Sequence, residues 1–397
     1  MLNSKKTHIN KENIQKNLEM ISFPRLSGTE HEQKAADKLI QEIKGLNLTP
    51  CIQEFSFSSF YSRIYKKIAF SLIFWLVFVI FININLIFTL INVFSVIIVF
   101  IPLIIYTRKP ENIHWGTKYN SKNIYLHLNS LKAESIENNL QKENPNTNEN
   151  LQLLFLSHYD SKSQTFPIRL RVIALRSWIY TIILISIGLI IKFLFFDFIV
   201  INIIIVILLF VNFISTIMII LNFSKNKSDG AIDNGSGVSI TLELLKYYAQ
   251  PQHRPEDIDL WFVFTGAEET GTMGIRFFKD ILKEYEKDNV KFFNLDAIAQ
   301  HLDIFGSTNL YDLDNNFFNF LFDLSEPLDS TITIKRYITA ITRSDGYYLK
   351  KQGYLGLDFG DKESYKYIHT AKDTVDKINC GLLSEICELF IYFLNKV

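Results

Sequence analysis

Five short motifs in this chain carry side chains that can bind metal ions. The motifs are Leu-Ser-His158-Tyr-Asp160-Ser, Gly-Ala-Ile-Asp233-Asn-Gly-Ser-Gly, Phe-Thr-Gly-Ala-Glu268-Glu269-Thr-Gly, Phe-Asn-Leu-Asp296 and Ile-His369-Thr. Two imidazoles and three carboxylates form a suitable ligand set for two zinc ions that share one bridging carboxylate. The extra glutamate beside a ligand glutamate supplies a general base. The chemistry that this pattern predicts is metal-assisted hydrolysis.

The positions of these motifs along the chain favour a common site. His158 follows a strand predicted over 153–156, and Asp296 follows one predicted over 292–295. The Glu268–Glu269 pair follows a buried strand predicted over 260–265. In open α/β sheets, ligands collect at the carboxyl ends of the strands. A lone histidine, an Asp-Asn-Gly turn or a surface Glu-Glu pair would mean little, but all five motifs occur in the required local context.

Strands and helices are expected to alternate along the polar part of the chain. Strands are predicted over 51–57, 124–128, 151–156, 260–265, 291–295, 331–335 and 354–359. Helices are predicted over 34–44, 238–249, 272–285, 317–325, 344–352 and 381–397. Thr29-Glu-His-Glu32 has the pattern of a helix capping box. This alternation predicts an α/β fold with a mixed, mainly parallel sheet and helices on both faces.

Two long apolar blocks interrupt this pattern. Residues 68–106 are almost entirely apolar, and as a single helix they would span about 58 Å, twice the thickness of a bilayer core. A break near Asn83–Asn85 gives two membrane spans joined by a tight turn. The second block, 177–223, has Lys192 and Asp197 in its middle and also divides into two spans, 177–196 and 199–223. The sequence therefore predicts four transmembrane helices in two hairpins, and the second hairpin lies between His158 and Asp233.

Basic residues flank both hairpins at the ends that join the rest of the chain. The flanking residues are Arg63, Lys66, Lys67, Arg108, Lys109, Arg169, Arg171, Arg176, Lys225 and Lys227. Because positively charged flanks remain in the cytoplasm, the hairpin ends and the catalytic domain are expected on the cytoplasmic face. The sequence thus predicts a multi-pass integral membrane protein.

The composition limits the remaining possibilities. The 397 residues carry 41 basic and 41 acidic side chains, and this balance gives no reason to expect a nucleic-acid partner. The three cysteines fit a reducing compartment better than a disulfide framework. The polar first 20 residues argue against a cleaved signal peptide. The oligomeric state cannot be derived from the sequence.

With these motifs, the chain resembles the co-catalytic two-zinc aminopeptidase family, whose superfamily includes bacterial leucyl aminopeptidases, glutamate carboxypeptidases and glutaminyl cyclases. The most specific segments are Gly230-Ala-Ile-Asp-Asn-Gly-Ser-Gly237 and His369-Thr-Ala-Lys-Asp373-Thr, and Pro24-Arg-Leu-Ser-Gly-Thr29 resembles the opening segment. The similarity covers about residues 20–60 and 120–397 without the hydrophobic insertions. The resemblance implies a catalytic domain over 20–62 and 110–397 without 172–224, and membrane hairpins at 66–107 and 172–224.

The resemblance also implies roles for individual residues. Asp233 would bridge two zinc ions, with His158 and Asp296 completing one site and Glu269 and His369 the other. Glu268 would be the general base, which takes a proton from the attacking water and passes it to the leaving amine. Asp160 would orient His158. The expected function is that of a membrane-anchored zinc exopeptidase acting on peptide substrates, most simply an aminopeptidase.

The sequence departs from the family pattern at one place near the site. Ser344-Asp345-Gly346 stands where relatives often have Ser-Asp-His, so an imidazole is missing that Tyr347 or Tyr348 would have to replace. His158-Tyr-Asp-Ser-Lys162 also resembles glutaminyl cyclases, which leaves a cyclase-like acyltransferase with one zinc as an alternative. A non-catalytic membrane receptor on a peptidase fold is a second alternative, which the intact Glu268 disfavours. A transporter is disfavoured because the spans carry few ionisable groups.

Overall fold

The computed structural model describes residues 9–132, 150–195, 198–305, 335–337 and 344–396. The chain divides into two compact units. One unit comprises Met1–Ser56, Tyr119–Ser163 and Asn226–Val397, and the other comprises Phe57–Lys118 and Gln164–Lys225. The expected helix over 317–325 and most of the expected strand over 331–335 lie outside the described residues.

The first unit is built on one mixed sheet. Its strands lie in the order β1-β2-β6-β3-β7-β10-β8-β9. Their bounds are β1 Cys51–Ser58, β2 Lys118–Leu128, β3 Leu151–His158, β6 Ile258–Thr265, β7 Val290–Leu295, β8 Asp303–Phe305, β9 Lys335–Tyr337 and β10 Leu355–Gly360. The four central strands β6, β3, β7 and β10 are parallel, whereas β2 and β8 run antiparallel to their neighbours β6 and β10. The predicted α/β fold is confirmed.

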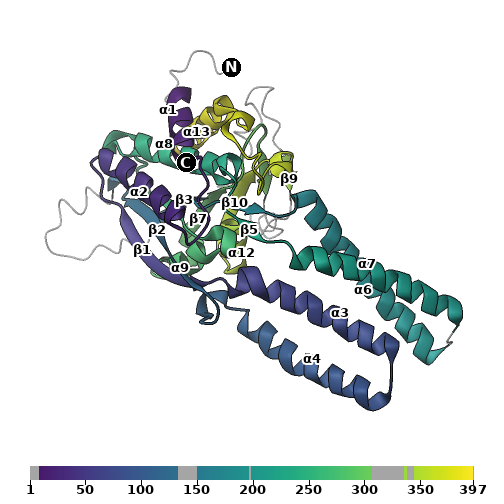
Figure 1. Cartoon of the computed structure of the whole chain (residues 1–397). Coiled ribbons are helices and arrows are strands. Elements are labelled where there is room, and N and C mark those ends of the chain that lie inside the picture. Colours follow the sequence, from purple (N-terminus) through teal and green to yellow (C-terminus); the bar gives the residue numbers. More distant parts are fainter. Residues whose placement is uncertain (1–8, 133–149, 196–197, 306–334, 338–343, 397) are drawn as a thin grey trace. The chain divides into compact units, whose positions relative to one another are not determined.

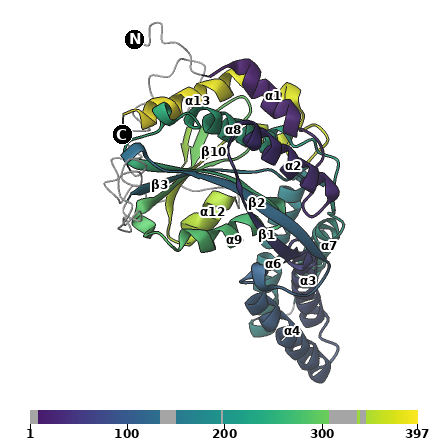
Figure 2. The same ribbon diagram turned by 90° about the vertical axis from the view of Figure 1, so that its left-hand side faces the viewer.

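Helices cover both faces of this sheet (Figures 1 and 2). One face carries α1 (Lys11–Ile21), α2 (Glu30–Gly45), α8 (Ser236–Tyr248) and α13 (Cys380–Leu394). The other face carries α9 (Met273–Leu282) and α12 (Asp345–Lys351). Helix α1 was not among the predicted helices, although Ile14, Leu18 and Ile21 are fully buried at helical spacing.

The central strands are apolar on both faces because both faces are covered. In β3, Leu154 and Leu156 pack into the cluster under α9 and α12. The intervening Phe155 faces the opposite layer, where its ring lies 5.3 Å from that of Phe390 in α13. Such a rigid central strand holds the residue at its carboxyl end, His158, in a fixed position.

The second unit consists mainly of two helical hairpins (Figure 1). The first is α3 (Lys66–Ile82) and α4 (Leu86–Tyr106), and the second is α6 (Ile168–Leu194) and α7 (Ile199–Ile220). Asn83, with φ 44°, ends α3, and the Asn85 side chain accepts from Phe88 N at the start of α4. The predicted break near Asn83–Asn85 therefore matches the turn between the two helices. Helix α6 begins at Ile168 rather than near 177.

Within the described residues, four helices are long and apolar enough to cross a membrane: Phe60–Ile82, Leu86–Tyr106, Ile168–Leu194 and Ile199–Ile220. Few of their side chains are buried against protein, and Ile98 and Phe210 are 70% and 64% exposed. Several polar side chains inside the hairpins find partners. Asn212 Nδ2 donates to Thr181 Oγ1 over 2.7 Å, which joins α6 to α7. These surfaces suit a lipid environment.

Candidate metal centre

The structure brings all five sequence motifs together. His158 ends β3, Asp296 directly follows β7, and the pair Glu268–Glu269 opens a 3-10 turn after β6. Asp233 lies in the turn Ala231–Gly235 that leads into α8, and His369 lies in a loop before α13. Their donor atoms form two groups that share Asp233, each with atoms within 4.8 Å of one another: His158, Asp233, Asp296, and Asp233, Glu269, His369.

The spacing of these donor atoms fits zinc. His158 Nε2 lies 3.1 Å from Asp233 Oδ1 and 3.6 Å from Asp296 Oδ1. His369 Nε2 lies 3.1 Å from Asp233 Oδ2 and 3.2 Å from Glu269 Oε1. Zinc bonds of about 2.0–2.2 Å at a tetrahedral angle place ligand atoms about 3.3–3.6 Å apart. Each group therefore has the donor types and nearly the separations of a zinc site, and Asp233 offers one oxygen to each.

Asp160 contacts both His158 and the turn that carries Glu268 and Glu269. Its Oδ1 accepts from Glu268 N over 3.0 Å, and its Oδ2 accepts from Glu269 N over 3.1 Å and from the Ser27 hydroxyl over 2.5 Å. His158 Nδ1 lies 3.1 Å from the Asp160 main-chain oxygen and 3.4 Å from Oδ1. The sequence predicted only the contact with His158. The carboxylate in fact joins one histidine to both glutamates.

Glu32 binds the same turn, a role that the sequence did not predict. Its Oε1 accepts from Ala267 N over 3.0 Å, and its Oε2 accepts from Gly28 N. Three successive backbone N–H groups, those of residues 267–269, thus point at two buried carboxylates. Burial, followed by the charge of Asp160, raises the pKa of Glu32 to about 8. The capping-box prediction was wrong in part, because the Thr29 side chain makes no capping hydrogen bond.

Arg25 is fully buried and binds two of the segments that carry candidate metal ligands. Its guanidinium donates to four main-chain carbonyls, those of Phe23, Tyr159, Asp229 and Gly230. Burial lowers the pKa of Arg25 to about 10 against the opposing effect of the surrounding carboxylates. Since unpaired buried charges are costly, the bonds compensate the buried cation and join the segment after His158 to the segment before Asp233.

Asp373 holds the backbone of Asp233, the candidate ligand that both groups share. Its Oδ1 accepts from Ile232 N over 2.6 Å, and its Oδ2 accepts from Asp233 N over 3.3 Å. Burial, followed by the negative charge of Asp233, raises the pKa of Asp373 to about 7. The motif that begins at His369 therefore supplies both a candidate ligand and a support for Asp233.

Glu268 is placed beside both groups without belonging to either. Burial raises the pKa of Glu268 well above its usual range, and the negative charges of Glu269 and Asp345 act in the same direction, against the opposing charge of His158. A carboxyl group in such surroundings accepts a proton more readily than an exposed one. This is the property that a proton-transferring group needs.

Packing explains why glycine occupies position 346. A Cβ there would lie 2.1 Å from Asp358 Oδ1, which is held by the Ser344 hydroxyl over 2.8 Å and by Asn294 Nδ2 over 2.9 Å. No imidazole fits at this position. Tyr348 does not replace it, because its ring is packed in the core, but Tyr347 remains exposed.

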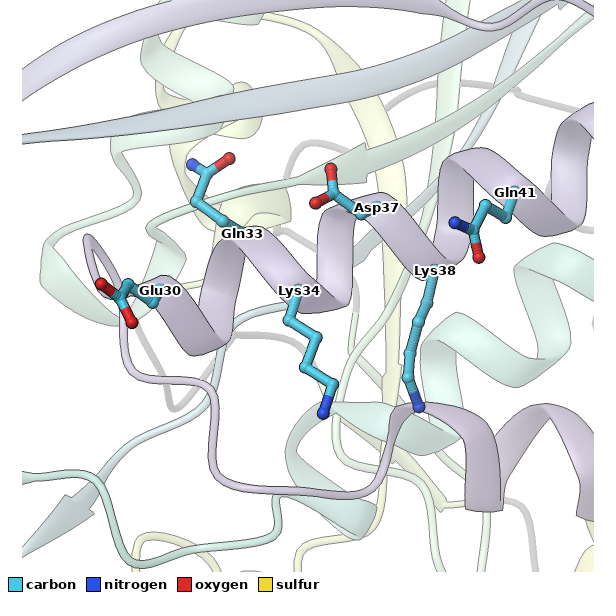
Figure 3. Close-up of a pocket in the computed structure, with 6 residues that line it drawn as sticks. All are labelled: Glu30, Gln33, Lys34, Asp37, Lys38 and Gln41. Atoms are coloured by element: carbon cyan, nitrogen blue, oxygen red, sulfur yellow. The ribbon is translucent and has the colours of Figure 1, made fainter.

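A surface hollow of about 430 Å³ lies elsewhere, along α2 (Figure 3). It is lined by Glu30, Gln33, Lys34, Asp37, Lys38 and Gln41. All of these side chains are hydrophilic and come from one helix, and none belongs to the five motifs. The hollow therefore shares no residue with the candidate metal centre.

Comparison with known proteins agrees with this geometry. The model of peptidase family M28 matches residues 217–394, a segment that contains four of the five candidate ligands but not His158. A vacuolar membrane protease of Schizosaccharomyces japonicus is 32% identical over 148 residues, 37% of this chain and 17% of the relative. Aminopeptidase YwaD of Bacillus subtilis is 28% identical over 169 residues, 41% of this chain and 36% of the relative. The chain thus spans well under half the length of either relative.

Solved structures share the fold at low sequence identity. A zinc aminopeptidase from Bacillus subtilis superposes with a TM-score of 0.55 at 14% identity, covering 99% of this chain and 96% of that one. A glutaminyl cyclase from an Acidobacteriales bacterium superposes with a TM-score of 0.54 at 13% identity, covering 100% and 97%. The resemblance inferred from the sequence is thereby confirmed: residues 217–394 are similar to peptidase family M28, and the chain shares its fold with a solved zinc aminopeptidase.

Proposed function

We propose that this protein is a membrane-anchored zinc exopeptidase that removes N-terminal residues from peptides, with two zinc ions at one site. The observation that carries the proposal is the position of Asp233. Its two carboxylate oxygens lie 3.1 Å from Nε2 of His158 and 3.1 Å from Nε2 of His369, so one side chain serves two ligand groups. Two ligand groups that share one carboxylate are the arrangement expected of a two-zinc site.

The five ligands would hold the zinc pair, with His158 and Asp296 on one side of Asp233 and Glu269 and His369 on the other. Zinc bound there would polarise the substrate carbonyl and lower the pKa of the attacking water. Glu268 would take the proton from that water and deliver it to the departing amine. Asp160 and Glu32 would hold the Glu268 backbone in place through the turn that they cap.

A glutaminyl cyclase-like acyltransferase is the second candidate. The segment His158-Tyr-Asp-Ser-Lys162 resembles these enzymes, and one of them shares the fold. A single bound zinc and cyclisation of N-terminal glutamine would favour this candidate. The complete pair of ligand groups favours the peptidase.

Blocking the substrate amine tests the proposed exopeptidase reaction. An aminopeptidase requires a free N-terminus, so acetylation of a short apolar peptide is expected to abolish nearly all cleavage by the full-length protein in detergent. The two peptides would be compared by mass spectrometry of the released residues. Equal cleavage of both would contradict aminopeptidase activity and indicate a carboxypeptidase or endopeptidase.

We also propose that the four apolar helices span a membrane and that the catalytic unit faces the cytoplasm. The support is the set of basic residues at the chain-joining ends of both hairpins, among them Lys66 and Lys67 at the start of α3 and Arg169 and Arg171 in the first turn of α6. The opposite ends carry Lys192 alone among described basic residues, where its Nζ donates to Asn202 Oδ1 over 2.8 Å.

A native cysteine allows this orientation to be measured. Cys51 is exposed, whereas Cys380 and Cys387 are buried. A membrane-impermeant maleimide is expected to label the protein only after the cells are permeabilised, and Cys51→Ser is expected to lose that label. Labelling of Cys51 in intact cells would place the catalytic unit outside the cytoplasm.

A further inference from the structure

Lys162 is a buried cation at the metal centre that the proposed reaction does not use. It follows His158 by four residues, and its side chain is only 14% exposed. Its Nζ pairs with Glu269 Oε2 and also lies 3.3 Å from the main-chain oxygen of Glu269, to which it donates. One ammonium group therefore holds both the side chain and the backbone of a candidate zinc ligand.

The two oxygens of Glu269 consequently have different surroundings. Oε2 is bound to the Lys162 ammonium, whereas Oε1 lies 3.2 Å from His369 Nε2, close to the separation expected of two ligands on one zinc ion. Charge-assisted hydrogen bonds of this kind are among the stronger polar contacts in proteins. For Oε2 to bind a metal, the carboxylate would have to give up its bond to a buried cation.

We propose that Lys162 is a positioning residue that restricts Glu269 to one ligand oxygen and so keeps a coordination position open at the metal held by Asp233, Glu269 and His369. The inference rests on the proposed zinc-dependent function. Catalytic zinc sites have three protein ligands and leave the fourth position to water or substrate. Asp233 Oδ2, Glu269 Oε1 and His369 Nε2 make three, and Glu269 Oε2 would be a fourth that closes the site.

The other half of the centre is built differently. In the part of the chain that the structure describes, Asp296 pairs with His158 but with no lysine or arginine. Among those residues, nothing comparable to Lys162 restrains the second oxygen of Asp296. The protected open position therefore lies on the Glu269 side of the centre, next to Glu268.

Removing the charge of Lys162 tests the inference on the zinc-loaded full-length protein in detergent. Zinc K-edge X-ray absorption counts the light atoms around the metal. In Lys162→Met, binding of Glu269 Oε2 is expected to raise the average count by about 0.5 atom per zinc, since one new bond is shared between two ions. We expect kcat to fall about 10–100-fold, as for other residues that orient a metal ligand. Lys162→Arg keeps the cation and is expected to restore both values toward normal.

Lys283→Met is the matched control, because Lys283 is an exposed lysine paired with Asp280. It should change neither the zinc environment nor kcat. Lys162→Gln provides the same comparison if the methionine variant does not fold. An unchanged zinc environment in folded, zinc-loaded Lys162→Met or Lys162→Gln would overturn the role given to Lys162. Failure of the unsubstituted protein to bind zinc at all would instead refute the proposed function.

Discussion

Glu268→Gln is expected to lower kcat by about 10²–10⁴-fold while the zinc content stays unchanged. Glutamine has nearly the shape of glutamate but cannot accept the proton of the attacking water. The backbone N–H of residue 268 donates to Asp160 Oδ1, and this bond does not depend on the side chain. The turn should therefore remain in place in the variant. Turnover of a free-amine peptide and zinc content would be measured on the same preparation.

Glu269→Gln is the informative control for that variant. Glu269 belongs to a ligand group and is paired with Lys162, so its substitution is expected to weaken zinc binding as well as turnover. The two neighbouring glutamates should thus give different results. Near-normal kcat in zinc-loaded Glu268→Gln would remove Glu268 from the role of general base.

Asp233→Ala is expected to lose both zinc ions, which would be the largest effect of any single substitution on metal content. Asp233 is the only residue common to the two ligand groups, and each of its oxygens lies 3.1 Å from a histidine Nε2. Asp376→Ala, which removes an exposed carboxylate paired with Lys377, should retain the metals. Zinc would be measured by elemental analysis after dialysis. Retention of one full equivalent in Asp233→Ala would show that the two groups bind independently.

The assembly of the centre could be predicted because the sheet dictates it. His158, Glu268 and Asp296 each follow a central strand closely, and parallel neighbouring strands end at the same edge. Apolar runs such as Leu153–Leu156 identified these strands, since strands covered on both faces are apolar throughout. Short-range sequence patterns were therefore enough to locate the candidate ligands.

The supporting residues could not be predicted in this way. Arg25, Glu32 and Asp373 act through hydrogen bonds to backbone groups that are distant in sequence, and no local pattern encodes those partners. Glu32 instead fitted the local pattern of a capping box. Likewise, Gly346 appeared as a missing histidine, whereas the structure shows that the position of Asp358 leaves no room for a side chain.

The two apolar hairpins were likewise predicted only in part. Asn83 and Asn85 marked the turn of the first hairpin because polar residues that adopt left-handed or capping conformations end helices. Helix α6 begins before the predicted span because the flanking residues Arg169, Arg171 and Arg176 are themselves helical. Arginine is a good helix former, and the helix continues through all three residues.

Zinc content is the most direct test of the account. The full-length protein would be purified in detergent, saturated with zinc, dialysed and analysed for metal per chain. Two zinc ions per chain, with activity rising as the metal is restored to the metal-free protein, is the predicted result, because Asp233 offers one oxygen to each of two ligand groups. A value that stays at one under saturation, with full activity, would contradict the two-zinc centre and favour the cyclase-like alternative.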